Sequence, residues 1–144
     1  MRTVTRSLPL VLGLTLIVGA LLSPGKPLQA KQAPAPLRTY TPGQLLVSRP
    51  YDRRVALEGT AREGNRICTA RYCQQGCCNA CGASLQLEER GTTVTLSSSS
   101  TVQVGCGGNE CSVKCSPLTP GKRYRVEGIL GRDLRFQVLS FQAI

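Results

Sequence analysis

Eight cysteines constrain this 144-residue chain more than any other feature. They form two groups, one of five and one of three, separated by about 25 residues. The first group is Cys68, Cys73, Cys77, Cys78 and Cys81, and the second is Cys106, Cys111 and Cys115. An even number of cysteines in a small chain is typical of a disulfide framework. We therefore expect all eight to form structural disulfides.

The order of the cysteines limits how they can pair. Cys77 and Cys78 are neighbours and could bond to each other only with severe strain, so we expect them to have different partners. Each group has an odd number of members, so at least one bridge must join the two groups if every cysteine is oxidised. The rest of the connectivity stays open, because eight cysteines allow many pairings.

The N-terminal 30 residues have the order of a secretory signal peptide. Arg2 and Arg6 precede an apolar run at 8–22, and a short segment ending in the small residue Ala30 follows. A membrane-spanning helix needs about 20 apolar residues, more than this run offers. We expect cleavage after Ala30, a secreted or periplasmic location and no stable membrane span after cleavage. Retention as an N-terminal anchor is the alternative.

The remaining chain divides into a tether and a domain. Residues 31–39 are rich in proline and alanine and predict a flexible tether, and residues 40–144 form one domain. Without Arg2, Arg6 and Lys26, 15 of the 18 basic residues remain against eight acidic residues, a formal charge of +7. This balance favours an anionic partner. Arginines spread over a solvated surface would give the same charge.

Short segments of alternating apolar and polar residues predict strands. They lie at 55–61, 83–89, 92–96, 101–105, 122–130 and 134–141. The dipeptide Arg90-Gly91 predicts a hairpin turn between the second and third of them. The segments 62–82 and 105–121, which carry the cysteines, have no period and predict long loops. Thr41 could cap a short helix with Pro42 at its first position.

Two similar motifs carry a resemblance to a known fold. They are V-A-L-E-G at 55–59 and Y-R-V-E-G at 124–128, and each places a glycine where a strand can bend. With the hairpin between them, they resemble small exported bacterial OB-fold proteins. The resemblance implies an all-β fold, a small five- or six-stranded OB-like barrel with long disulfide-linked loops. The helix that OB-folds usually have between strands three and four is missing, and a cysteine-containing loop takes its place.

The sequence lacks the residues that most catalytic mechanisms need. It contains no histidine, which excludes Ser-His and Cys-His nucleophilic pairs. Most acidic residues alternate with apolar strand residues and so face solvent. We therefore expect no enzyme and no cofactor, but an exported binding or structural accessory protein whose ligand or protein partner the sequence does not identify.

Two other functions remain open. Cys78 and Cys81 form a C-x2-C motif, which could be half of a zinc or copper site or a redox pair. A single-stranded nucleic-acid-binding OB-fold would need basic residues beside stacking aromatics. The candidate ligand-binding residues of that kind are Arg71, Tyr72, Arg123, Tyr124 and Arg125. Export argues against a nucleic-acid partner.

Overall fold

The computed structural model describes residues 36–144 except residue 75. The predicted signal peptide, 1–30, and residues 31–35 of the predicted tether lie outside the described residues. The described part is mostly β, with eight strands in one sheet and one short helix. The elements are β1 (Thr39–Tyr40), α1 (Pro42–Ser48), β2 (Arg54–Cys68), β3 (Ala80–Glu89), β4 (Thr92–Ser97), β5 (Gly105–Asn109), β6 (Ser112–Ser116), β7 (Arg123–Leu130) and β8 (Phe136–Ala143).

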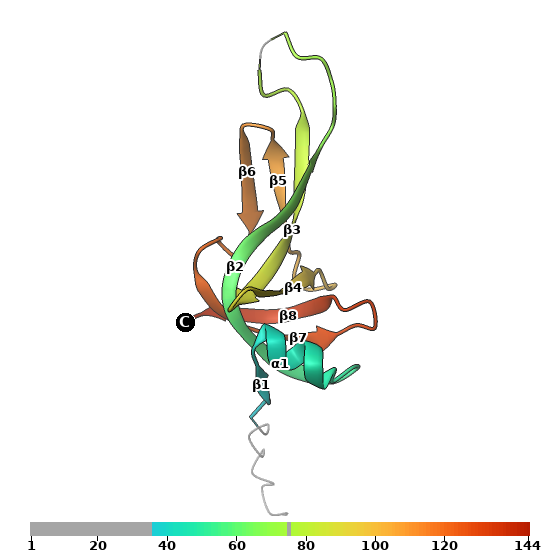
Figure 1. Ribbon diagram of the computed structural model, residues 1–144, viewed down its shortest axis with the longest axis vertical. Helices are drawn as coiled ribbons and strands as arrows, with labels where there is room; N and C mark the ends of the chain where they lie inside the picture. The colour runs from blue at the N-terminus through green and yellow to red at the C-terminus, as the bar shows by residue number, and fades with distance from the viewer. Residues whose placement is uncertain (1–35, 75) are drawn as a thin grey trace, which may run out of the picture. The chain divides into compact units, whose positions relative to one another are not determined.

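The strand pairings return to the strand on which they begin. From β2 the sheet passes through β7, β8 and β4 to β3, and β3 pairs again with β2. All of these pairings are antiparallel except β4–β8, which is parallel and short. The hairpin β5–β6 joins the outer part of β3, and β1 pairs with β2. Figure 1 shows β5 and β6 beside the far parts of β2 and β3, away from β7, β8 and α1.

The hydrophobic core lies inside this cycle of strands. Leu57, Leu87, Val126, Phe136 and Val138 are fully buried there, one or more from each of β2, β3, β7 and β8. On β7 every second residue is buried, which is the alternation of a strand with one face on a core. Burial of these aliphatic side chains is the main stabilising contribution to the fold.

The helix α1 forms as its local sequence predicts. Thr41 caps it, and the side chains and backbones of Thr41 and Gln44 exchange the two hydrogen bonds of a capping box. Pro42 occupies the first turn, where its missing N–H costs nothing. The helix ends at Ser48, and Leu45 enters the core with no exposed surface.

The structure corrects two predicted loops. The segments 62–82 and 105–121 are not free of strands, because β2 runs on to Cys68, β3 begins at Ala80, and β5 and β6 form a hairpin. The arm parts of β2 and β3 and the whole of β5 lack alternation because much of their surface is exposed, whereas β6 alternates but is only five residues long. The total is therefore eight strands, where five or six were expected.

The predicted strand at 101–105 is also wrong. Residues 101–104 form no strand, and β5 begins at Gly105. The hydroxyl of Ser99 accepts a hydrogen bond from the backbone of Val102, and the hydroxyl of Ser98 accepts one from the backbone of Val104. Serine side chains thus satisfy backbone groups that a strand would pair with a neighbouring strand. The alternation arose because Val102 and Val104 pack against the core from a loop.

Candidate binding surface

All eight cysteines are paired, in four disulfides that lie close together. They join Cys68 to Cys81, Cys73 to Cys78, Cys77 to Cys111 and Cys106 to Cys115. Two predictions are confirmed: Cys77 and Cys78 have different partners, and one bridge joins the two groups. Disulfides on this scale indicate an oxidising compartment.

The disulfides define one part of the described chain, residues 62–83 and 105–116, which we call the arm. Two of the bridges link residues directly opposite each other on paired strands, Cys68 with Cys81 and Cys106 with Cys115. The other two bridges hold the loop 69–79 between β2 and β3. The core cluster reaches the arm only at Cys106, with a few partly buried residues packed against it. Cross-links therefore provide much of the order that a hydrophobic core would otherwise give.

A hydrogen-bond network around Asn79 organises the loop 69–79. The side-chain oxygen of Asn79 accepts a bond of 2.7 Å from the backbone N–H of Arg71. Its side-chain nitrogen donates a bond of 2.7 Å to the carboxylate of Glu110, in the turn between β5 and β6. The backbone N–H of Glu110 in turn donates to the carbonyl of Asn79, at 3.0 Å. The Cys77–Cys111 bridge lies next to these contacts in sequence, so the loop and the turn are joined in two ways.

The electrostatics of this network centre on Glu110. The hydrogen bond from Asn79 holds the pKa of the Glu110 carboxyl below its ordinary value, against a smaller opposing effect of desolvation. Backbone N–H groups of Cys77 and Cys78 lower this pKa further. Cys77 has a φ of 71°, a region that residues other than glycine seldom adopt. Its backbone N–H acts on the Glu110 carboxylate and its sulfur is bonded to Cys111.

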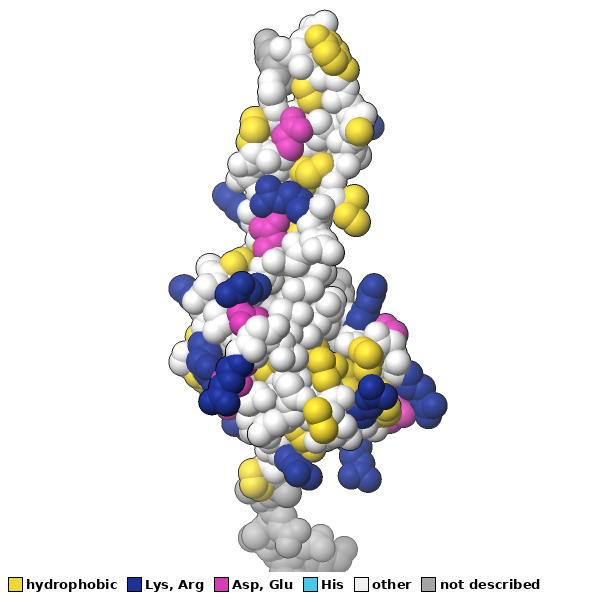
Figure 2. All heavy atoms as spheres, viewed as in Figure 1, with side chains coloured by type: hydrophobic (Ala, Val, Ile, Leu, Met, Phe, Trp, Pro, Cys, Tyr) yellow, Lys and Arg dark blue, Asp and Glu magenta, His cyan; other side chains and the backbone are white. Residues whose placement is uncertain are grey.

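The arm exposes large apolar side chains. Tyr72, in the loop 69–79, is 94% exposed, and Ile67, on β2, is 78% exposed. Figure 2 shows hydrophobic side chains at the surface along this part of the molecule, whereas Lys and Arg gather mainly over the part that contains β7, β8 and α1. An exposed aromatic on a rigid loop is a feature of protein recognition surfaces.

The sequence-predicted binding residues fall into two separate places. Arg71 and Tyr72 lie in the loop 69–79. Arg123 pairs across the sheet with Thr60 on β2, eight residues before Cys68, which corresponds to about 25 Å along the strand. The structure therefore does not bring the five candidates into one site.

Of the β7 candidates, the tyrosine faces inward and the arginines are paired. Tyr124 is 5% exposed, its hydroxyl accepts a hydrogen bond of 3.0 Å from the backbone of Thr119, and its ring meets Phe141 edge-on. Arg123 pairs with Glu89 at 3.3 Å, and Arg125 pairs with Glu58 at 3.2 Å. The period of two along β7 could have predicted that Tyr124 faces the core, since Val126 shares its face.

The C-x2-C motif is not a unit in the structure. Cys78 is bonded to Cys73 and Cys81 to Cys68, so the two do not form a redox pair. Cys73, Cys78 and Glu110 do bring two sulfurs and a carboxylate close together. Both sulfurs are held in one disulfide, however, and a thiolate is the form that binds a metal. Zinc or copper binding here would require prior reduction.

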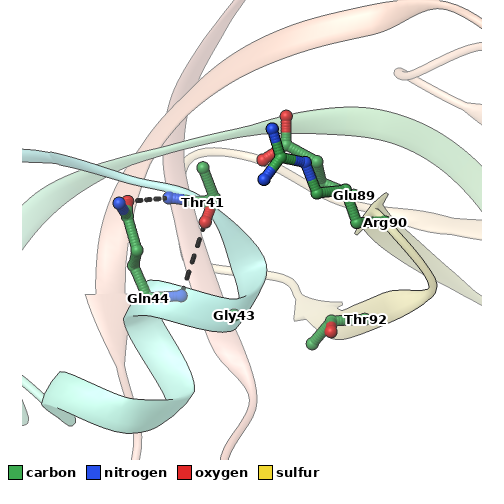
Figure 3. Close-up of a pocket in the computed structure, with 6 residues that line it drawn as sticks. All are labelled: Thr41, Gly43, Gln44, Glu89, Arg90 and Thr92. Carbon is green, nitrogen blue, oxygen red and sulfur yellow. Dashed lines mark hydrogen bonds between the residues drawn. The ribbon is translucent and has the colours of Figure 1, made fainter.

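A cavity lies elsewhere, between α1 and the turn from β3 to β4. Its volume is about 400 Å³. Figure 3 shows its lining residues, Thr41, Gly43, Gln44, Glu89, Arg90 and Thr92. Thr41 and Gln44 are occupied with each other in the helix cap, and Glu89 pairs with Arg123. These six residues contain no nucleophile with an adjacent general base.

Comparisons of the chain with protein-family models, with curated proteins and with solved structures found no match. The part of the chain that the structure describes contains no helix that could span a bilayer.

Proposed function

We propose that the protein is a non-catalytic, exported binding protein, in which an OB-like barrel carries its binding surface on the arm. The cycle of five paired strands around a buried core supports a small barrel of this kind. In this assignment β2 and β3 are the first two barrel strands, and the loop 69–79 connects them. OB-folds use the loop between these two strands in ligand binding.

One observation carries the proposal: all four disulfides lie in the arm, together with the two large apolar side chains that it exposes. Outside the arm the chain has no cysteine, and Cys106 is the one arm cysteine that belongs to the hydrophobic core cluster. A loop needs rigidity of this degree when its conformation must be fixed before a partner arrives, because ordering it on binding would reduce affinity. Tyr72 and Ile67 are the residues that a partner would contact first.

The absence of histidine supports a role without catalysis. The cysteines, which are the strongest potential nucleophiles, are all consumed in disulfides. Two observations support a secreted or periplasmic location. A signal peptide is predicted at 1–30, and four disulfides need an oxidising compartment.

Charge pairing weighs against the nucleic-acid alternative. Six of the eight acidic residues form ion pairs with arginines. On the outer surface of β2, β3 and β7 these pairs neutralise Arg54, Arg62, Arg123 and Arg125. A groove that tracks phosphates needs cations that are free to contact them.

The proposal is tested with three forms of the chain used as bait in a periplasmic or secreted extract of the source organism. They are the wild type, an Ile67→Ser/Tyr72→Ala variant and a Val47→Ser control. Val47 is a matched control because it is also an exposed apolar residue, 85% exposed, but lies on α1. We expect quantitative mass spectrometry to find proteins retained by the wild type and the control and lost from the arm variant.

Two outcomes would contradict the proposal. One is an unchanged set of retained proteins in the arm variant. The other is tight binding of a single-stranded oligonucleotide that weakens steeply with salt and is lost in an Arg123→Ala/Arg125→Ala variant. That result would favour the nucleic-acid function instead.

A further inference from the structure

Two glycines lie side by side on the exposed face of the arm. The pairing of β2, β3, β5 and β6 places Ile67 opposite Gly82, Gly82 opposite Gly107, and Gly107 opposite Lys114. Residues directly opposite each other on paired strands share a face of the sheet. All four are exposed, whereas Cys81 and Cys106, which belong to the other face, are buried. The row therefore has bare backbone in its middle and a large side chain at each end.

The fold does not require these glycines. A Cβ atom at Gly107 would meet no atom within 4 Å, and one at Gly82 would meet only the backbone oxygen of Cys106, at an ordinary 3.7 Å. Gly108 shows the contrast, because its φ is 154° and a Cβ there would collide with the backbone oxygen of Ser112. A glycine inside a strand weakens the strand unless something approaches its backbone closely. Gly82 and Gly107 thus leave the exposed face of the arm free of side chains between Ile67 and Lys114.

The cleared surface suits an aromatic ring. Three strand spacings separate Ile67 from Lys114, about 14 Å between their backbones, which leaves room for one ring over the two glycines. The peptide planes would form the floor, Ile67 an apolar wall and the Lys114 ammonium a cation against the ring face. Aromatic side chains are known to cover glycines in sheets in this way. We call the row of Ile67, Gly82, Gly107 and Lys114 the glycine trough.

The arm itself carries an aromatic side chain that is almost fully exposed to solvent. Tyr72 is 94% exposed, whereas Phe141 is 39% exposed and the other tyrosines and phenylalanines of the described residues are buried or half-buried. Three bridges and the Asn79 network fix the loop that presents it. One chain therefore contains both a ring without a partner and a surface shaped for a ring.

We propose that the trough binds Tyr72 of a second copy of this chain, in a two-fold symmetric dimer in which each copy supplies one ring and one trough. Such an isologous contact is closed and self-complementary. This inference rests on the proposed function of the arm as a binding element, and it names a partner for it. The ring-and-trough contact involves only the face of the arm sheet, so no strand needs to be added at an edge.

The edges of the arm sheet support face contact over edge contact. The edge strand β6 carries Lys114 at its centre. Beyond its pairing with β7, β2 carries Arg62 and Arg66, and its pairing with β3 has a bulge there. Charges and bulges are the devices that prevent a sheet edge from pairing with another chain. The exposed face has no such protection over Gly82 and Gly107.

The contact is small, so the dimer should be weak. One tyrosine buries about 150–250 Å², and two such contacts with their surroundings stay below the about 1,200 Å² of a stable interface. We therefore expect reversible association at high micromolar to millimolar concentration.

Sedimentation equilibrium of the full oxidised chain tests this inference. We expect the wild type and Val47→Ser to approach the mass of a dimer as concentration rises. Tyr72→Ala and Gly107→Val should weaken association at least about tenfold. Gly107→Val fills the trough from a position where a Cβ atom meets no other atom within 4 Å, and circular dichroism would verify that it folds. An equimolar mixture of these two variants restores one intact contact, so it should associate more strongly than either variant alone.

A wild type that stays monomeric at millimolar concentration would overturn the inference, as would a Tyr72→Ala variant that associates like the wild type. The proposed function fails by a different result, because it depends on which extract proteins the arm variant loses. A monomeric wild type with arm-dependent capture would remove the dimer and leave the binding function in place.

Discussion

The side-chain amide of Asn79 donates a hydrogen bond of 2.7 Å to the carboxylate of Glu110, across 31 residues of sequence. This contact joins the loop 69–79 to the turn between β5 and β6, beside the Cys77–Cys111 bridge. It makes the order of the loop depend on the charge of one carboxylate.

We predict that the loop loses order in acid. The pKa of Glu110 is lower in the folded protein than in the unfolded chain, so its stabilising contribution is complete above the ordinary pKa of glutamate, about 4.3. The contribution is lost as the pH falls through the lower folded value. In NMR spectra, the side-chain amide protons of Asn79 should titrate with a midpoint below the ordinary value. In Glu110→Gln this titration should vanish, and a midpoint at the ordinary value would contradict the prediction.

We predict that removing the Cys77–Cys111 bridge loosens the arm and leaves the core intact. The bridge spans 34 residues, and the chain-entropy account gives such a loop about 3–4 kcal/mol. In Cys77→Ser/Cys111→Ser, amide exchange should accelerate in 69–79 but remain slow at Val126 and Phe136. The bridge Cys106–Cys115 provides a comparison, since it spans nine residues and should contribute about 2–3 kcal/mol. Equal acceleration across the whole chain would argue against an independent arm.

We predict that Tyr124 contributes to stability and not to binding. Tyr124→Phe removes the acceptor for the Thr119 N–H and should lower the free energy of unfolding by about 0.5–1.5 kcal/mol. Tyr124→Ala also leaves a cavity and should cost about 3–5 kcal/mol. Urea denaturation measures both. A Tyr124→Phe variant with unchanged stability that loses captured partners would contradict this assignment.

We predict opposite behaviour for two strand glycines. A Cβ at Gly128 would collide with the backbone oxygen of Gln137 and lie 2.6 Å from the ring of Phe136. Gly128→Ala should therefore lower the free energy of unfolding by about 2–3 kcal/mol. Gly107→Ala meets open space and should be neutral or stabilising by up to about 1 kcal/mol. Equal losses in the two variants would contradict an open environment at Gly107.

The sequence predicted the parts of the fold that rest on a buried face. The alternation at 83–89 and 92–96 and the turn Arg90-Gly91 correspond to β3 and β4, and the cap at Thr41 corresponds to α1. These elements place apolar side chains in the core, and that leaves a periodic signal. The predicted strands at 122–130 and 134–141 likewise overlap β7 and β8.

The arm left almost no signal of this kind. β5 reads Gly-Cys-Gly-Gly-Asn, a composition of turns, and it is a strand because β3 and β6 pair with it and a disulfide fixes Cys106 to Cys115. Strand propensity and hydrophobic periodicity do not report which strands pair or which cysteines are bonded. The odd number of cysteines in each group did predict the bridge between the groups, now identified as Cys77–Cys111. It could not show that Tyr72 would be exposed at the loop that this bridge holds.

Disulfide mapping tests the account most directly. Complete tryptic cleavage without reduction should leave four peptides in one linked cluster, 67–71, 72–90, 91–114 and 115–122, because three of the four bridges cross the cleavage sites. Partial reduction and alkylation should then release 67–71 by opening Cys68–Cys81 alone and 115–122 by opening Cys106–Cys115 alone. A bridge between Cys78 and Cys81, or a free thiol at Cys77 or Cys111, would contradict the cross-linked arm on which the proposed function depends.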